Sequence, residues 1–200
     1  MSPRIALRIG TVLATVVLGF FALGKWMAQQ DAPRALDWKA QYQESLWGPL
    51  QQGALTLAGV NAVLGTGTLW MISSDGEPLL VSRHPLESDA LSWRLQAVIT
   101  LDEQRTASLV EAQAWTPESP DQPVNPAVGE ALADYPVARM SLIPAEPVDV
   151  SRIYGSFGNP DVRMDVSDGN QAWVYARNGV VVAVTGEQAH SIMFGLKREL

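Results

Sequence analysis

Few side chains in this sequence have the types and spacing that chemistry requires. The two histidines, His84 and His190, have no histidine, aspartate or glutamate four residues further on, the spacing at which helical side chains share a metal ion. His84 precedes Pro85 near the end of an expected strand. We therefore expect both histidines to be solvated or hydrogen-bonded side chains rather than metal ligands or catalytic bases.

The serine and carboxylate candidates lead to the same expectation. Ser156 lies in Gly155-Ser156-Phe157-Gly158, which lacks the Gly-x-Ser-x-Gly spacing of a hydrolase nucleophile. Asp102-Glu103, Asp165 and Asp168 fall in expected hairpin turns, where acidic residues are ordinary turn formers. The sequence thus predicts no catalytic residue, no metal site and no cofactor-binding site, and the protein is expected not to be an enzyme.

The composition excludes several further classes. The 200 residues include no cysteine, which excludes disulfides, zinc–thiolate sites, iron–sulfur clusters and the lipid attachment of a mature lipoprotein. The formal net charge is -7, whereas a nucleic-acid binder needs a basic face to displace counterions from phosphates. The same charge argues against electrostatic docking on anionic lipid. With 47% hydrophobic residues, the chain can form a packed core.

An uncharged apolar segment, residues 9–24, lies between Arg8 and Lys25. With the apolar residues on either side it reaches the roughly 20 residues that span a bilayer. We expect residues 1–28 to form a transmembrane signal-anchor helix whose end charges reach the interfaces. Two alternatives stay open: a cleaved signal peptide, with small residues at 22–24, and a buried core helix.

The charges around this segment predict an orientation. Arg4 and Arg8 precede it, and positive charge on that side favours a cytoplasmic N-terminus with the remainder translocated. The expected location is the bacterial inner membrane, crossed once, with the C-terminal domain in the periplasm. The bilayer is contacted through residues 9–24, and no nucleic acid is expected as a partner.

Residues 29–53 are expected to form an amphipathic connecting helix. Asp31 can cap it and Pro33 is tolerated in its first turn. Apolar residues recur near the helical period: Leu36, Tyr42, Leu46, Trp47 and Leu50. The predicted helix covers residues 33–47, and Gly48-Pro49 breaks the pattern.

Residues 54–115 are expected to form a β-rich subdomain. Short β-prone runs lie at residues 55–58 and 62–64. A hairpin follows, in which residues 68–73 and 79–82 flank the turn signal Asp75-Gly76.

A second hairpin is expected in the same subdomain. Its strands would be residues 93–101 and 107–115, joined by the polar residues 102–105. A helix stays open as an alternative, because four apolar residues also recur at helical spacing: Leu91, Leu95, Val98 and Leu101.

Residues 116–126 hold four prolines among polar residues, which is typical of a surface linker. We take this linker as the boundary between two subdomains, the second of which spans residues 127–200. In the second, Asp149 or Ser151 can cap a helix that ends at Gly158-Asn159-Pro160.

Three strands are expected after this helix, and a closing helix after them. The strands are residues 162–166, 172–176 and 180–185, with turn signals at Asp168-Gly169 and Asn178-Gly179. Alternation in the middle strand places Trp173 and Tyr175 on one face, toward the helix. Residues 188–200 are expected to form the closing helix.

Residues 148–184 resemble a known fold. Phe157-Gly158-Asn159-Pro160 at a helix end, followed by Trp173-Val174-Tyr175 in a strand, resembles the SmpA/OmlA-like fold. That fold occurs in the small lipoprotein of the outer-membrane barrel-assembly machinery and in a proteinaceous β-lactamase inhibitor. Ile153 matches its apolar position one turn earlier, whereas Pro144-Ala145-Glu146-Pro147 replaces its opening glycine-methionine-threonine. The resemblance implies a protein-binding or scaffolding module without catalysis.

The expected fold is α+β, with an N-terminal transmembrane helix followed by antiparallel sheet and packed helices. The expected function is non-catalytic binding of another envelope protein by the exported domain, in assembly, maintenance or scaffolding. The alternative is an exported domain that binds a ligand or a cell-wall fragment with exposed tryptophans. Of the seven tryptophans, four are expected in the core: Trp70, Trp93, Trp115 and Trp173.

Overall fold

The computed structural model describes Leu18 and residues 34–196. The chain divides into two compact units, Met1–Arg34 and Ala35–Leu200. The predicted membrane segment, residues 9–24, lies outside the described residues except for Leu18, as does the expected start of the connecting helix. No helix within the described residues has the length and apolar character needed to cross a membrane.

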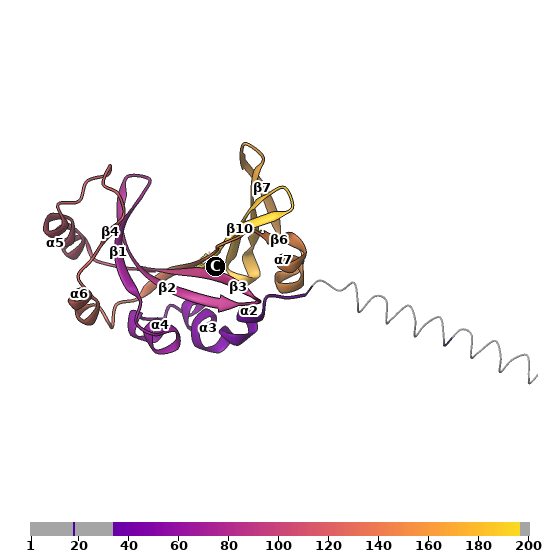
Figure 1. Cartoon of the computed structure of the whole chain (residues 1–200), viewed down its shortest axis with the longest axis horizontal. Helices are drawn as coiled ribbons and strands as arrows, with labels where there is room; N and C mark the ends of the chain where they lie inside the picture. Colours follow the sequence, from indigo (N-terminus) through magenta and orange to yellow (C-terminus); the bar gives the residue numbers. More distant parts are fainter. Residues whose placement is uncertain (1–17, 19–33, 197–200) are drawn as a thin grey trace, which may run out of the picture. The chain divides into compact units, whose positions relative to one another are not determined.

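The second unit is an α+β domain built on a large antiparallel sheet (Figure 1). Within the described residues the sheet has ten strands, in the order β4-β1-β2-β3-β5-β10-β9-β8-β7, with β6 paired to β10. The strands are β1 (Thr68–Ser74), β2 (Glu77–Ser88), β3 (Leu91–Ile99), β4 (Gln122–Pro123), β5 (Val137–Pro144), β6 (Val148–Asp149), β7 (Val162–Ser167), β8 (Asn170–Tyr175), β9 (Val180–Thr185) and β10 (Gln188–Phe194).

Helices cover one side of this sheet and its flank (Figure 1). Because β3 pairs with β5, strands from residues 54–115 and from residues 127–200 lie in one continuous sheet. The helices are α2 (Asp37–Gln41), the π-helix η1 (Gln43–Trp47), α3 (Gly48–Gln51), α4 (Leu57–Leu64), α5 (Glu103–Gln113), α6 (Pro126–Ala131), α7 (Val150–Phe157) and the 3₁₀ turn η2 (Ala176–Asn178).

The hairpins with aspartate–glycine turns form as predicted. Asp75-Gly76 joins β1 to β2 and Asp168-Gly169 joins β7 to β8, and all four residues have the positive φ that a type I′ turn requires. The Asn178-Gly179 prediction was wrong in detail. Only Gly179 is left-handed, and η2 lengthens the connection between β8 and β9.

Two stretches predicted as strands are helices. Residues 107–115 lie largely in α5, because the Asp102 carboxylate caps it by accepting a hydrogen bond from the Arg105 N–H at 2.8 Å. The β-prone runs around residues 55–64 form α4, which Thr56 caps through the Gly59 N–H. In both cases the capping side chain and the surrounding packing outweigh the weak local β preference.

Two further expectations were wrong at the ends of the domain. The predicted closing helix is strand β10, because Ile192 and Phe194 alternate into the core while Met193 pairs outward across the sheet. Gly48-Pro49 does not end the helical segment, since proline is tolerated in the first turn of α3. The π-helical turn η1 leads directly into it.

The larger of two buried clusters lies between the sheet and the helices α2–α4 and α7. Trp38 is fully buried at its centre and meets Trp47, Trp93 and Phe194 edge-on, with ring centroids 5.6–5.9 Å apart. Such edge-to-face pairs add about 0.5–1.5 kcal/mol each beyond the area they bury. The smaller cluster, around Leu80 and Trp115, lies beneath α5 and α6.

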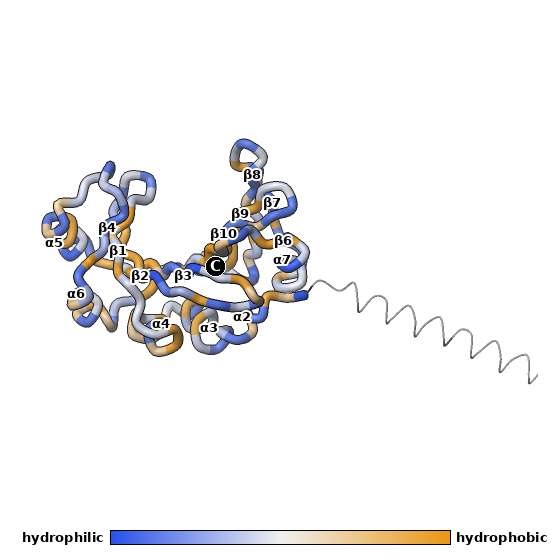
Figure 2. Tube along the Cα trace, in the orientation of Figure 1, coloured by the Kyte–Doolittle hydropathy of each residue, from blue (hydrophilic) through white to orange (hydrophobic). Residues whose placement is uncertain are grey.

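None of the helices in the described part of the chain lies on the other side of the sheet, which we call the open face. Along β3, Trp93, Leu95, Ala97 and Ile99 are buried, whereas Arg94 is exposed and Gln96 and Val98 are half-buried on the open face. Figure 2 shows apolar and polar stretches in the strands of this sheet.

Candidate functional site

Strand β7 is an edge of the sheet. It pairs only with β8 among the described strands, and all six of its residues are exposed. Val162, Met164 and Val166 keep 50%, 49% and 66% of their surfaces accessible. An edge strand leaves a row of backbone donors and acceptors available to another chain, and natural proteins usually protect it with proline, lysine or a covering segment.

The charged residues of β7 are held on the face toward α7. The Arg163 guanidinium lies 4.5 Å from the Trp173 ring centre and donates to the Tyr154 hydroxyl at 2.7 Å. Asp165 accepts from the Gln171 amide at 3.0 Å, and Asp161 accepts from the Ala176 N–H at 2.8 Å. The opposite face of β7 therefore presents Val162 and Met164.

Helix α7 positions β7 and β8. Asp149 caps it by accepting from the Ser151 N–H at 2.7 Å, and the Ser151 hydroxyl, followed by this N–H, lowers the pKa of Asp149. Trp173 and Tyr175 face the helix as predicted, with Tyr154 5.3 Å from Trp173 and Phe157 5.4 Å from Tyr175. Burial raises the pKa of Tyr175 to about 12, so the phenol is neutral in the core.

One row of paired residues crosses the open face from β7 to β1. It begins with apolar side chains and ends with polar and basic ones: Val162, Val174, Val181, Met193, Ser141, Gln96, Arg83 and Thr68. The half of the open face beside β7 is thus apolar. The other half carries Arg83, Arg94 and Arg139.

A partly buried ion pair connects the start of the domain to α7. The carboxylate of Asp89, in the β2–β3 turn, is paired with Arg152 of α7 and accepts from the Asp37 N–H at 3.1 Å. Arg152 also donates to the Ala35 carbonyl. Burial alone would raise the pKa of Asp89, but its bonds to Asp37, Ser88 and Arg152 lower it below the ordinary value.

The candidate nucleophiles and bases have structural partners. His84 is buried in β2, with Nε2 2.9 Å from the Ser82 hydroxyl and Nδ1 3.1 Å from the Gly65 carbonyl oxygen. Burial lowers the pKa of His84, and the Gly65 carbonyl partly opposes this. A Cβ on Gly67 would lie 2.5 Å from the imidazole, so Gly67 closes over the pair. The Ser82–His84 distance would suit a general base beside a hydroxyl nucleophile, but both side chains are buried and a substrate cannot reach them.

Ser156 and His190 lie in different elements, α7 and β10. Ser156 is buried, donates to the Arg152 carbonyl at 2.7 Å and accepts from the Leu36 N–H at 2.8 Å. It therefore ties α7 to the beginning of the domain. His190 is exposed on β10, beside the bulge in its pairing with β9. Within the described residues, no three histidine, aspartate or glutamate side chains are grouped to hold a metal ion.

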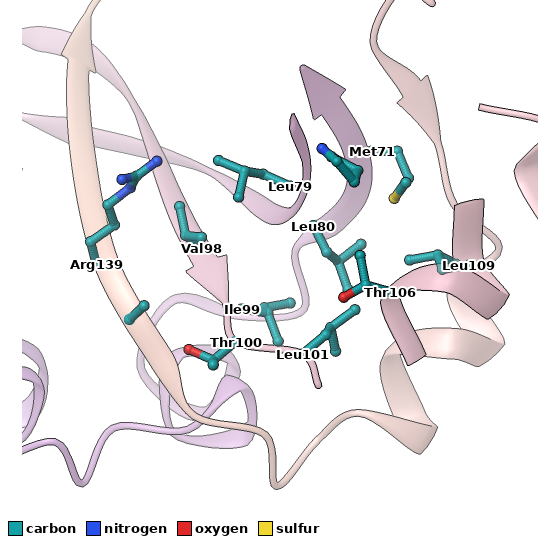
Figure 3. Close-up of a pocket in the computed structure, with 12 residues that line it drawn as sticks. Met71, Leu79, Leu80, Val98, Ile99, Thr100, Leu101, Thr106, Leu109 and Arg139 are labelled. Carbon is teal, nitrogen blue, oxygen red and sulfur yellow. The ribbon is translucent and has the colours of Figure 1, made fainter. Parts of the chain in front are cut away.

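Two apolar hollows adjoin α5. The first, of about 300 Å³, lies between the ends of β1–β3, β5 and α5 (Figure 3). The second, of about 540 Å³, lies between α5 and α6. Neither is lined by a tryptophan. Trp93, Trp115 and Trp173 are core residues as predicted, whereas Trp70 is half-buried beneath the Arg83 guanidinium, 4.6 Å from its ring centre.

The sequence reasoning missed the buried Ser82 and the half-buried pair Asp89 and Arg152. Ser82 and His84 are two apart on a strand and so share a face, a signal that was available in the sequence. The Asp89–Arg152 pair joins residues 63 positions apart, and no local pattern indicates it. The chain matches no family model, no curated protein and no solved structure. The SmpA/OmlA-like resemblance stays a prediction.

Proposed function

We propose that this chain is a membrane-anchored envelope protein whose exported domain binds another protein without catalysing a reaction. Strand β7 is the proposed docking element. The observation that supports this is the exposed edge itself: six exposed residues, paired on one side only among the described strands, with three exposed apolar side chains. Residues 9–24 are the proposed anchor, crossing the inner membrane once and placing the domain in the periplasm.

The proposed mode of binding is addition of a strand. An extended segment of the partner would form backbone hydrogen bonds along the free side of β7, and its alternate side chains would cover Val162 and Met164. The bulge between Asp165 and Ser167 interrupts the regular ladder, so the regular pairing is confined to the first part of the strand.

The charges around β7 favour a partner over a second copy of this chain. Residues 161–168 carry Asp161, Asp165 and Asp168 against the single Arg163. Three aspartates against one arginine give this segment a net charge of -2 in each copy, and like net charge on adjacent strands is destabilising. The proposed partner segment is therefore extended and apolar, with basic residues among its outward side chains.

The test places a photo-reactive amino acid at Met164 of the full chain in its own membranes. The expected product is a cross-link to one envelope protein, at a peptide that combines apolar and basic residues. The matched control carries the same amino acid at Glu111, which is exposed on α5. Adding Val162→Lys and Val166→Lys is expected to reduce the Met164 product at least tenfold, about 1.4 kcal/mol of binding free energy.

Three results would contradict the proposal. A product with a second copy of the chain would assign β7 to self-association. Identical products from Met164 and Glu111 would show non-specific proximity. If the lysine substitutions left the Met164 product unchanged, the partner would not bind along the edge of β7.

A further inference from the structure

Helix α5 covers part of the sheet without burying any of its side chains. Its eleven residues include only four that are half-buried, at helical spacing: Thr106, Leu109, Val110 and Gln113. A helix of this length usually buries an apolar stripe against the layer beneath it. Leu109 and Val110 do pack on the smaller cluster, but beside Thr106 and Leu109 the helix borders the first hollow, of about 300 Å³.

The lining of this hollow is mostly apolar, and its three polar residues, Thr100, Thr106 and Arg139, come from different elements. Nine of its twelve lining residues are apolar, among them Met71, Leu79, Val98 and Leu109 (Figure 3). A mostly apolar lining with a few polar groups is typical of sites that bind small apolar molecules. Its volume lies at the lower end of the range for small-molecule sites, which suits one acyl chain better than two.

Among the described residues that line the hollow, Arg139 is the only charged one. It is half-buried on β5 opposite Val98, and its side chain has no ion pair or hydrogen bond among the described residues. No acidic residue lines the hollow. Gly195 packs on the Arg139 backbone, with an added Cβ only 2.9 Å from the Arg139 Cα, so no side chain from that position fills the space beside it.

We propose that this hollow binds a single-chain anionic amphiphile, such as a fatty acid. The acyl chain lies between α5 and the ends of β1–β3, and the hollow continues past the end of β3 to the open face, where the carboxylate pairs with the Arg139 guanidinium. A charge-assisted bond at a half-buried arginine adds the specificity that an apolar hollow lacks. The proposal is independent of partner binding at β7, because the two regions share no residue.

The test labels the full chain in phosphatidylcholine vesicles with a photo-reactive fatty acid, and maps the labelled peptides. Labelling is expected within residues 71–80 and 98–109. Arg139→Gln is expected to reduce it about tenfold, the effect of losing one charge-assisted hydrogen bond. The matching fatty alcohol is expected to label more weakly, and Arg139→Gln is expected to leave its labelling unchanged.

Further variants and a second lipid probe test the position of the acyl chain. Leu109→Trp, which fills the hollow from α5, is expected to reduce labelling by both probes, and Val98→Phe serves the same purpose from β3. Arg94→Gln, exposed on the same face of β3, is expected to change nothing. A photo-reactive phosphatidylglycerol is expected to label these peptides less than the fatty acid does.

The overturning results are equally specific. Labelling confined to residues 1–33 would place the probe in the bilayer alone. If Arg94→Gln reduced labelling as much as Arg139→Gln does, the proposed contact between the carboxylate and Arg139 would be contradicted. Persistence of labelling in both filling variants, or stronger labelling by phosphatidylglycerol, would overturn the single-chain site.

Discussion

At the scale of single residues, His84 makes stability depend on pH. The folded chain buries it as the neutral form, and its pKa is lowered, whereas the unfolded chain protonates it near the ordinary value of about 6.5. The unfolded state therefore binds more protons as the pH falls below that value, and stability decreases until the folded pKa is reached. Above pH 7 this contribution is fully present.

Replacing His84 by glutamine is expected to flatten this dependence. Glutamine keeps a donor and an acceptor for Ser82 and Gly65 but does not titrate. Urea unfolding midpoints between pH 5 and pH 7.5 measure the effect, and His190→Gln, on the exposed side of β10, is the control that should keep the wild-type slope. An unchanged slope in the His84→Gln chain would contradict the assignment.

Asp89 is expected to carry a second, lower pH dependence. Its pKa is lowered in the folded chain, so its contribution is present above the ordinary carboxyl value and is lost as the pH falls through the folded value. Asp89→Asn is expected to destabilise the domain by about 2 kcal/mol, because Arg152 stays partly buried without its partner. Denaturant unfolding at pH 7 measures this, with the exposed Asp134→Asn as control. A loss no larger than the control's would mean that the pair is only a surface contact.

At the scale of elements, α5 is expected to be the least protected helix of regular length. It buries no side chain and borders two hollows, and segments with few buried contacts open at low free energy. Its amides should exchange with solvent at least tenfold faster than those of β3, which is paired on both sides. Hydrogen exchange followed by mass spectrometry measures this. Equal protection of the two elements would contradict the loose packing inferred here.

The elements also show where sequence reasoning succeeds. Hairpins β1–β2 and β7–β8 could be predicted, because aspartate–glycine pairs specify the turn within two residues. Helix α7 could be predicted from its Asp149 cap and its Gly158 ending. Helix α5 could not, because its alanines and its central Leu109-Val110 pair fit a strand almost as well, and the cap at Asp102 also looks like a turn.

At the scale of the whole molecule, the sequence indicates the α+β class but not which strand joins the two halves of the sheet. The α+β class follows from the mixture of local patterns, whereas the pairing of β5 with both β3 and β10 joins residues far apart in the chain. The sequence predicted that β7 is a strand, but it did not predict that β7 lies at the edge of the sheet. That position depends on the order of all the other strands.

The joining role of β5 is itself testable. Leu142 is fully buried in β5 and pairs with Leu95 on one side and Ile192 on the other. Leu142→Ala is expected to destabilise the domain by about 3 kcal/mol, the usual cost of a cavity in a core. Thermal unfolding should remain a single transition that is shifted downward. Two separate transitions in the wild-type chain would mean that the two halves of the sheet are independent domains.

The same strand has a consequence for the time course of folding. The strands β1–β3 and β7–β10 each form from neighbours in sequence, and such hairpins assemble within microseconds. Docking of β5 closes much longer loops, so it is expected to be the slow step. Until β5 docks, β3 and β10 each have one side without a paired strand. A newly made chain is most prone to aggregate during that interval.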